Sequence, residues 1–155
     1  SPTRGLVAGG YDSSGNHKII DFITIATLGN AQDFGELTDD VNHLAGCSNS
    51  TRGLFGGGQN PSNVNTISFV TIATIGNAID FGDLAHGGND GRIDYLGACA
   101  SATRGLFGGG QTPTKINTIQ FVTIAATGNT TDFGDLKEAR RFPMGFSDVH
   151  GGLAQ

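Results

Sequence analysis

The sequence predicts an all-β protein built from repeats of short antiparallel strands. Three observations lead to this fold class. One sequence pattern occurs three times along the 155 residues. Val, Ile, Phe and Thr are common, and these residue types favour strands. No segment shows a 3.6-residue apolar period of useful length, which an amphipathic helix would need.

The repeat is clearest in one glycine-rich tract. TRGLFGGGQ stands at Thr51–Gln59 and again at Thr103–Gln111, and a weaker copy, TRGLVAGGY, stands at Thr3–Tyr11. The stretches Thr51–Leu84 and Thr103–Leu136 share 25 of 34 residues. Copies this similar predict units with the same structure and the same role. We expect a single repeat domain over residues 1–155, with repeats at approximately 3–50, 51–102 and 103–155.

Each repeat contains four short apolar segments that we predict to be strands. In the second repeat they are Arg52–Gly57, Asn65–Thr74, Ala78–Leu84 and Tyr95–Ala100, and the first repeat has His43–Ser48 in place of the last. A turn-rich connection, GQNPSN, follows the first segment. Gly76-Asn77 stands between the second and third segments, and a two-residue loop with Gly first predicts a type II′ hairpin turn.

The second segment predicts sheets that are covered on both sides. Ile67 and Phe69 fall on one face of a strand, and Val70 and Ile72 fall on the other. Four strands in about fifty residues, with both faces apolar, are typical of a β-propeller blade between two neighbours. Glycine then allows close backbone approach near the propeller axis. A phosphate-binding loop is disfavoured, because no helix follows the glycines.

The arrangement R-x-x-F-G-G-G, followed by a strand and D-F-G-D-L, resembles a kelch-type repeat over almost the whole chain. The chain departs from the kelch pattern in having Phe69 and Phe81 where Tyr and Trp are usual. It is also similar to glycine-rich repeats of bacteriophage tail and fibre proteins. These resemblances imply kelch-like propeller blades and a phage origin.

Charged residues that recur once per repeat are predicted to be structural. They are Arg4, Arg52, Arg104, Asp33, Asp80 and Asp132. We expect each Arg to pair with an Asp within or between blades, because a bidentate pair positions strands and satisfies polar groups. A ring of Arg or Asp around a channel mouth is the functional alternative.

Ligand binding is predicted where the repeat is interrupted. The segment 85–96 is five residues longer than its counterpart in the first repeat, and two other segments, 11–18 and 137–144, also differ. The insertion offers amide, carboxylate and aromatic groups suited to sugar hydroxyls or a protein surface: His86, Asn89, Asp90, Arg92, Asp94 and Tyr95. A solvated loop that tolerates insertion is the alternative.

Composition disfavours several other classes of protein. The net charge of -5 argues against a nucleic-acid partner, and no apolar run is long enough for a membrane span. Asp80 and Asp83 lie three positions apart and would point to opposite faces of a strand, so we predict no metal site and no cofactor. Cys47 and Cys99 occupy equivalent positions in consecutive repeats, too far apart for a disulfide, and we expect both to be buried thiols.

The sequence therefore predicts a non-enzymatic propeller module for structural display or attachment that binds a glycan or a virion protein. Its location would be the virion or the extracellular space for a phage protein, and otherwise the cytoplasm. The alternatives are an intracellular kelch-like interaction scaffold and a carbohydrate-active enzyme with a site at the axial channel.

Three blades cannot close a ring, since propellers have four to eight. Gly145 and Ser147 align with Gly46 and Ser48, which precede the second repeat. We therefore expect a homodimer that forms one six-bladed propeller, in which each tail completes the partner's first blade. The alternative is that this chain is half of a longer protein with six consecutive blades.

Overall fold

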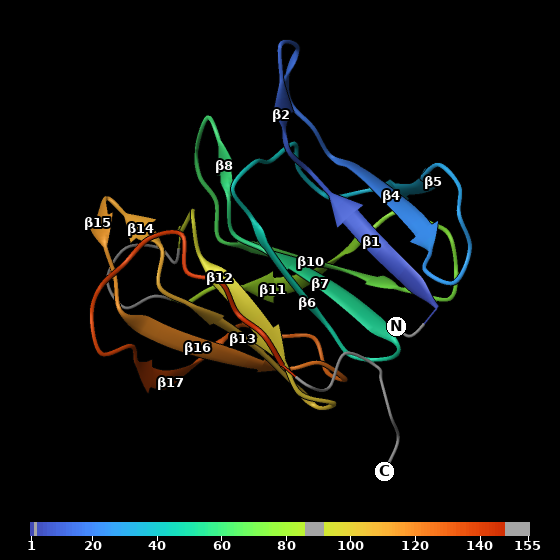
Figure 1. The fold of residues 1–155 in the computed structure, drawn as a ribbon. Helices are drawn as coiled ribbons and strands as arrows, with labels where there is room; N and C mark the ends of the chain where they lie inside the picture. Colours follow the sequence, from blue (N-terminus) through green and yellow to red (C-terminus); the bar gives the residue numbers. More distant parts are fainter. Residues whose placement is uncertain (2, 86–91, 148–155) are drawn as a thin grey trace.

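A computed structural model of the protein describes residue 1, residues 3–85 and residues 92–147. These residues form an all-β structure of three larger antiparallel sheets and three small hairpins, without a helix (Figure 1). The prediction of an all-β fold is confirmed. Within the described ranges, there is no helix with the length and apolarity needed to cross a membrane.

The three larger sheets follow the sequence repeats. The first has the order β1-β4-β5 and consists of β1 (Arg4–Ala8), β4 (Ile19–Thr24) and β5 (Gln32–Glu36). The second has the order β6-β7-β10-β11 and consists of β6 (Ala45–Ser48), β7 (Arg52–Gly56), β10 (Thr66–Thr71) and β11 (Ile79–Asp83). The third has the order β12-β13-β16-β17 and consists of β12 (Gly97–Ala100), β13 (Arg104–Gly108), β16 (Thr118–Thr123) and β17 (Thr131–Asp135).

The last segment of each sequence repeat pairs with the first strand of the next repeat. β6 pairs with β7, with Cys47 opposite Leu54, and β12 pairs with β13, with Cys99 opposite Leu106. Each complete sheet therefore begins about seven residues before the glycine-rich tract. In the first sheet, β1 pairs only with β4 among the described residues.

Three short hairpins extend the connections after β1, β7 and β13. They are β2–β3 (Tyr11–Asp12 and Gly15–Asn16), β8–β9 (Gln59–Asn60 and Ser62–Asn63) and β14–β15 (Gln111–Thr112 and Thr114–Lys115). All three project from the same end of the sheets (Figure 1). The sequence predicted only turn-rich connections at these residues.

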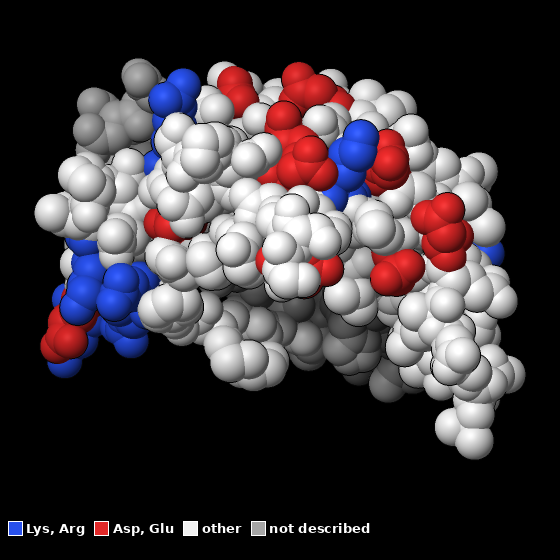
Figure 2. Space-filling model, turned by 90° about the horizontal axis from the view of Figure 1, so that it is seen from above, with Lys and Arg blue, Asp and Glu red and all other residues white. Residues whose placement is uncertain are grey.

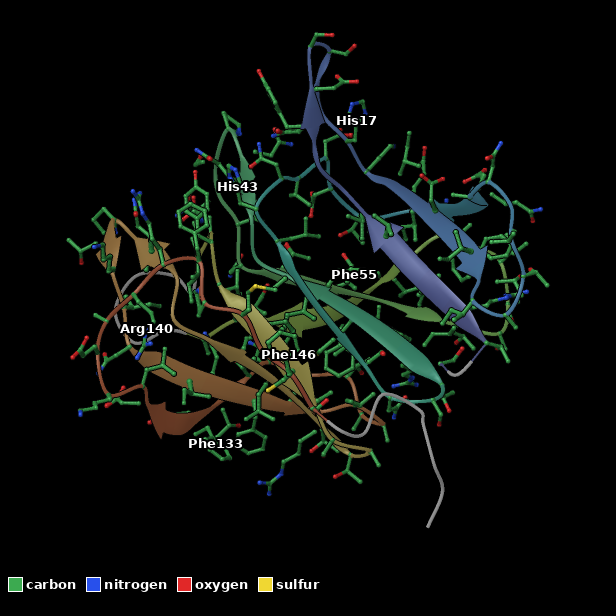
Figure 3. All side chains as sticks on the ribbon, viewed as in Figure 1. His17, His43, Phe55, Phe133, Arg140 and Phe146 are labelled. Atoms are coloured by element: carbon green, nitrogen blue, oxygen red, sulfur yellow. The ribbon has the colours of Figure 1, made fainter. Side chains whose placement is uncertain are left out.

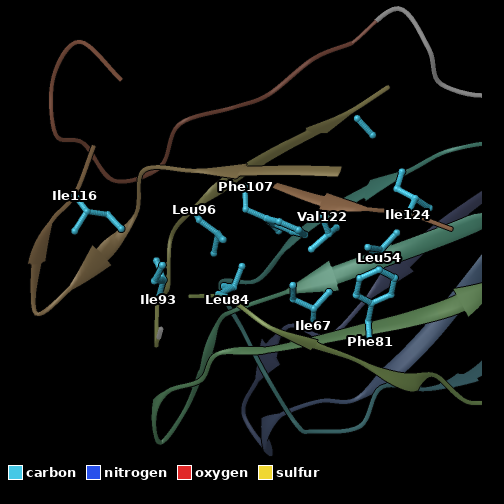
Figure 4. Packing of buried hydrophobic residues seen from close by; sticks show 12 residues of the cluster. Leu54, Ile67, Phe81, Leu84, Ile93, Leu96, Phe107, Ile116, Val122 and Ile124 are labelled. Carbon is cyan, nitrogen blue, oxygen red and sulfur yellow. The ribbon is translucent and has the colours of Figure 1, made fainter. Parts of the chain in front are cut away.

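The apolar core lies between successive sheets. One cluster joins the first sheet to the second through Ile20, Phe34 and Val70. The other joins the second to the third through Leu54, Phe81 and Phe107 (Figure 4). The second sheet is thus covered on both faces, as its sequence predicted.

The Gly-Asn pairs connect neighbouring sheets, and the predicted two-residue hairpin turn is wrong. β10 and β11 are joined by residues 72–78. Gly76 N–H donates to the Phe34 carbonyl of the first sheet at 2.8 Å, and Gly128 N–H donates to the Phe81 carbonyl of the second at 2.7 Å. Close approach is possible because Gly82, with φ 141°, faces Gly128: an added Cβ would lie 2.5 Å from the Gly128 carbonyl oxygen.

Cys47 and Cys99 are free thiols on β6 and β12, which lie in neighbouring sheets. The absence of a disulfide between them is as predicted, although both side chains are partly rather than fully buried. Burial raises the pKa of the Cys47 thiol to about 12.

Candidate functional site

The face that carries the three hairpins gathers most of the distinctive side chains of the molecule. We call it the loop face and define it by the hairpins, residues 11–16, 59–63 and 111–115, together with His43, Tyr95 and Phe142. His43 lies toward the hairpin end in Figure 3. Each of the three rings follows the outer strand of one sheet, β5, β11 or β17, and His43 and Tyr95 precede the first strand of the next sheet, β6 or β12.

The three rings form a row that crosses from one repeat to the next. The ring centroids of His43 and Tyr95 lie 4.1 Å apart, and those of Tyr95 and Phe142 lie 4.4 Å apart. The backbone follows the same path: Tyr95 N–H donates to the His43 carbonyl at 3.1 Å, and Phe142 N–H donates to the Tyr95 carbonyl at 2.8 Å. His43 and Phe142 are exposed, and Tyr95 is half-buried.

All three residues have a left-handed backbone. The φ angles are 56° at His43, 56° at Tyr95 and 59° at Phe142, and no other described residue except glycine has a positive φ. Such conformations cost roughly 1–3 kcal/mol each and concentrate at sites where the surrounding structure requires them. The left-handed turn directs each ring onto its neighbour, which creates the row.

Polar groups of the hairpins surround the row. Asn63 Nδ2 donates both to Asp94 Oδ1 and to the Gln111 carbonyl, each at 3.1 Å. Asp94 is 3% exposed, and desolvation raises the pKa of its carboxyl group. The Arg141 guanidinium lies 5.3 Å from the Phe142 ring centroid and donates to Gln111 Oε1 at 3.1 Å. The site therefore combines exposed aromatic rings with amide and guanidinium groups.

The residues predicted from the insertion have mixed outcomes. His86, Asn89 and Asp90 lie outside the described residues. Arg92 is exposed, whereas Asp94 is buried and Tyr95 belongs to the aromatic row.

Sequence reasoning missed His43 and Phe142. The repeat could have identified them, because they occupy the position of Tyr95 in the first and third repeats, directly after Asn42 and Arg141.

Two of the three recurrent arginines, Arg4 and Arg52, join neighbouring sheets. Within the described residues no arginine forms an ion pair with an aspartate, so the predicted pairing is wrong. Arg4 Nη1 donates to the Ile72 carbonyl at 2.9 Å, and Arg52 Nη1 donates to the Ile124 carbonyl at 2.8 Å. The guanidinium groups of Arg4, Arg52 and Arg104 lie 4.6–4.8 Å from the centroids of phenylalanine rings in their own sheets. A planar cation can use its face for the ring and its edge for the carbonyl.

The recurrent aspartates serve the outer strands. Asp80 Oδ1 accepts from Gly82 N–H at 3.0 Å, and Asp132 Oδ1 accepts from Gly134 N–H at 3.2 Å. The equivalent Asp33 has no such bond among the described contacts. These carboxylates support the bulge opposite β10 and β16.

No protein-family profile matches the chain, and a search of curated proteins finds no match to it.

Proposed function

We propose that the chain is a non-enzymatic module for structural display or attachment, of phage origin, which acts on a virion or outside the cell. Its sheets are kelch-like propeller blades, and two copies close into a homodimer with six blades. Support for the blades comes from the repeated sheet-on-sheet packing and from the hairpins that project at one end. The single observation that carries the attachment role is the row of His43, Tyr95 and Phe142 on the loop face.

The loop face has the chemistry of a binding surface for a glycan or a virion protein. Exposed rings offer apolar area at a low entropic cost, and the side-chain amide of Gln111 and the guanidinium of Arg141 offer directional hydrogen bonds. Such a combination recognises a ligand that presents both apolar patches and hydroxyl or amide groups.

An intracellular kelch-like interaction scaffold would use the same face. The identity of the ligand separates this alternative from the first proposal, because a glycan or a virion protein is the expected ligand only for the attachment module.

A glycan array tests the attachment role, with the labelled chain as the probe. We expect binding that Phe142→Ala and Arg141→Ala each weaken by about tenfold, since aromatic and arginine side chains dominate most binding sites. Ile79→Ala is the matched control, because Ile79 is 64% exposed, similar to Phe142 at 61%, and lies on the outer strand β11. A weakening of equal size in the control, or glycan binding that all three substitutions leave unchanged, would overturn the proposed site. If no glycan binds, the same variants are tested against purified virion proteins.

A further inference from the structure

The two end sheets each have one largely open face. The head face of the first sheet consists of Gly5, Val7, Asp21, Ile23 and Ile25. The tail face of the third sheet consists of Arg104, Leu106, Gly108, Ile119, Phe121, Phe133 and Leu136. Every sheet has a face equivalent to the head face and a face equivalent to the tail face. Inside the chain, the tail face of the first sheet packs on the head face of the second, and the tail face of the second packs on the head face of the third. Each internal junction therefore shows how a tail face binds a head face.

Apolar packing is the first feature of the internal junctions to compare with the open faces. Phe107, on the head face of the third sheet, is fully buried, and its ring lies 2.9 Å from the position of a Cβ at Gly56. The residue equivalent to Phe107 in the first sheet is Val7, which is 68% exposed.

The cavity that matches this side chain is open on the third sheet. Phe107 packs in the cluster that contains Ile67, Leu84 and Leu96. The equivalent positions of the third repeat are Ile119, Leu136 and Pro143, which, together with Gly108, line an open cavity of about 230 Å³. The tail face thus has the hollow for which Val7 of the head face is the matching side chain.

The arginine hydrogen bond to a backbone carbonyl of the following sheet is the second feature. Arg4 and Arg52 each donate to the carbonyl of an isoleucine in the following sheet, Ile72 and Ile124. Arg104 stacks on Phe121 in the same way, but is exposed and has no such carbonyl among the described residues. Ile25 is the residue equivalent to Ile72, and its side chain is 57% exposed on the head face. Within the described residues, neither the Arg104 guanidinium nor the Ile25 carbonyl makes this contact, and the two groups lie on the tail face and at the edge of the head face of one chain.

Backbone contacts at the outer strands follow the same pattern. The Gly76 and Gly128 amides donate to the carbonyls of Phe34 and Phe81. The third member of this series would join Gly29 to Phe133, and neither makes such a bond within the described residues. Gly35 and Gly82 are tightly approached by the neighbouring loop, whereas an added Cβ at the equivalent Gly134 would meet nothing within 4 Å.

One pair of facing positions is uncharged at both internal junctions but carries opposite charges at the two open faces. At the first junction, Thr38 Oγ1 bonds Ser68 Oγ at 2.7 Å. At the second, Ala85 N–H donates to Gln120 Oε1 at 2.8 Å. The residue equivalent to Thr38 and Ala85 in the third repeat is Lys137, and the residue equivalent to Ser68 and Gln120 in the first is Asp21.

A salt bridge between Lys137 and Asp21 would continue this series. Within the described residues, the ion pairs are His17–Asp12 and Lys18–Glu36, so neither Lys137 nor Asp21 is in one. A lysine and an aspartate therefore face the same junction position from opposite ends of the chain.

A groove beside β1 matches the segment 143–147. The groove has a volume of about 220 Å³ and is lined by β1, β6 and β7, including Gly5, Cys47 and Phe55. An inner strand placed there would lie beside β6, as β6 lies beside β12, and would pair with β1, as β6 pairs with β7. Residues 145–147 are equivalent to residues 46–48 at the end of β6 and already lie close to β12, where a Cβ added at Gly145 would clash with the Ala98 carbonyl oxygen.

From these matches we infer that a second copy of this chain covers both open faces, joined chiefly by Lys137–Asp21 salt bridges and by segment 143–147 in the partner's groove. This inference rests on the proposed closure of the propeller and names the residues that would join the two copies. Two identical head-to-tail junctions related by a two-fold axis would cover every open face.

The overall charge distribution favours the same pairing. Residues 1–50 contain six acidic and two basic residues, whereas residues 103–155 contain four acidic and five basic residues. Figure 2 shows basic side chains gathered at one end and acidic ones over the middle and the other side. Opposite charge at the two ends steers unlike ends together and opposes the pairing of like ends.

A charge exchange tests the inference, with sedimentation velocity as the measurement over a range of concentrations. Lys137→Asp and Asp21→Lys should each raise the dissociation constant of the dimer by about tenfold or more, because like charges would then meet at both junctions. The double variant should restore dimerisation to within about threefold of the unmodified chain. Asp40→Lys is the control for net charge, because Asp40 is exposed and lies outside the head face, and it should have little effect.

The outcomes separate the inference from the attachment role. A monomeric unmodified chain, as expected if the next repeats of a longer protein cover these faces, would overturn the inference. The inference would also be overturned if neither single substitution changed the dissociation constant of the dimer, or if the double variant did not recover dimerisation. A dimer that responds as predicted but binds no glycan and no virion protein would overturn only the attachment role.

Discussion

The second sheet and the two end sheets contain nearly the same residues in very different surroundings. Phe34, Phe81 and Phe133 are equivalent, yet the first two are 0% and 2% exposed and the third is 52% exposed. Figure 3 shows Phe133 at the lower edge of the third sheet. Because the local sequence is repeated, the neighbouring sheet decides the burial of each residue. The repeated sequence therefore forms the same contact surfaces in every sheet, and one of these surfaces is left exposed on each end sheet.

On the head faces, too, the burial of equivalent residues depends on the neighbouring sheet. Val70 and Ile72 of the second sheet are 3% and 2% exposed, whereas the equivalent Ile23 and Ile25 of the first sheet are 42% and 57% exposed. Large exposed apolar surface in a repeat protein indicates an interface. The comparison predicts that equal substitutions will have unequal effects at covered and open junctions.

The largest difference is expected for the aromatic rings. Phe107→Ala should lower the free energy of unfolding by about 3–5 kcal/mol, because the ring is fully buried between two sheets. Phe133→Ala should cost about 1 kcal/mol or less in chemical denaturation at dilute, monomeric concentration, because its ring is half exposed. Equal losses in the two variants would contradict the difference in burial between the covered and the open face.

A smaller difference is expected for glycines with the same backbone. Gly82 and Gly134 have φ angles of 141° and 139°, so alanine is strained equally at both. Only at Gly82 would the new Cβ lie 2.5 Å from a backbone carbonyl of the next sheet. Gly82→Ala should therefore destabilise the dilute chain by roughly 1–3 kcal/mol more than Gly134→Ala. In the dimer, Gly134→Ala should weaken association, which a concentration series of thermal denaturation would detect.

The arginines should differ less. Arg52→Ala removes both a hydrogen bond to the Ile124 carbonyl and the stacking on Phe69, and we expect a loss of about 1–2 kcal/mol. Arg104→Ala removes only the stacking on Phe121 from the isolated chain, and should cost about 0.5 kcal/mol in the same denaturation experiment. A larger loss for Arg104 at dilute concentration would contradict the assigned contacts.

The smallest effect concerns the reactivity of the two thiols, without any change in stability. Cys47 lies on β6, between the groove beside β1 and the second junction; its Sγ is 3.0 Å from the Cβ position of Gly105, and burial raises the pKa of its thiol to about 12. Cys99 lines the open cavity on the tail face. Native alkylation of the dilute, monomeric chain followed by mass spectrometry should label Cys99 roughly tenfold faster, because the thiolate is the reactive form and the raised pKa keeps Cys47 protonated. Equal rates would argue against the difference between the junctions.

Local sequence patterns were sufficient to predict the strands of the three larger sheets, but not the short hairpins or the contacts between sheets. Alternation in segments such as ISFVTIA identified β10 and its two apolar faces, because strand periodicity is a local property. The role of Gly76-Asn77 could not be read locally, since its hydrogen-bonding partner, Phe34, is far away in the sequence. Local turn preference suggested a hairpin, and contact with the neighbouring sheet overrode it.

The site was predictable only in part for the same reason. The insertion drew attention to Asp94 and Tyr95, but the row becomes visible only when His43 and Phe142 are compared at the same repeat position. The arginines looked like partners for aspartate because both types recur. Their actual acceptors are backbone carbonyls, which no side-chain pattern can indicate.

The mass of the unmodified chain in solution tests the central claim most directly. Native mass spectrometry and light scattering at micromolar concentration should both give about twice the chain mass of 15.9 kDa, because two copies cover both open faces. The dimer should be closed, so that raising the concentration produces no larger species. A stable monomer of 15.9 kDa, or an open series of growing oligomers, would contradict the account.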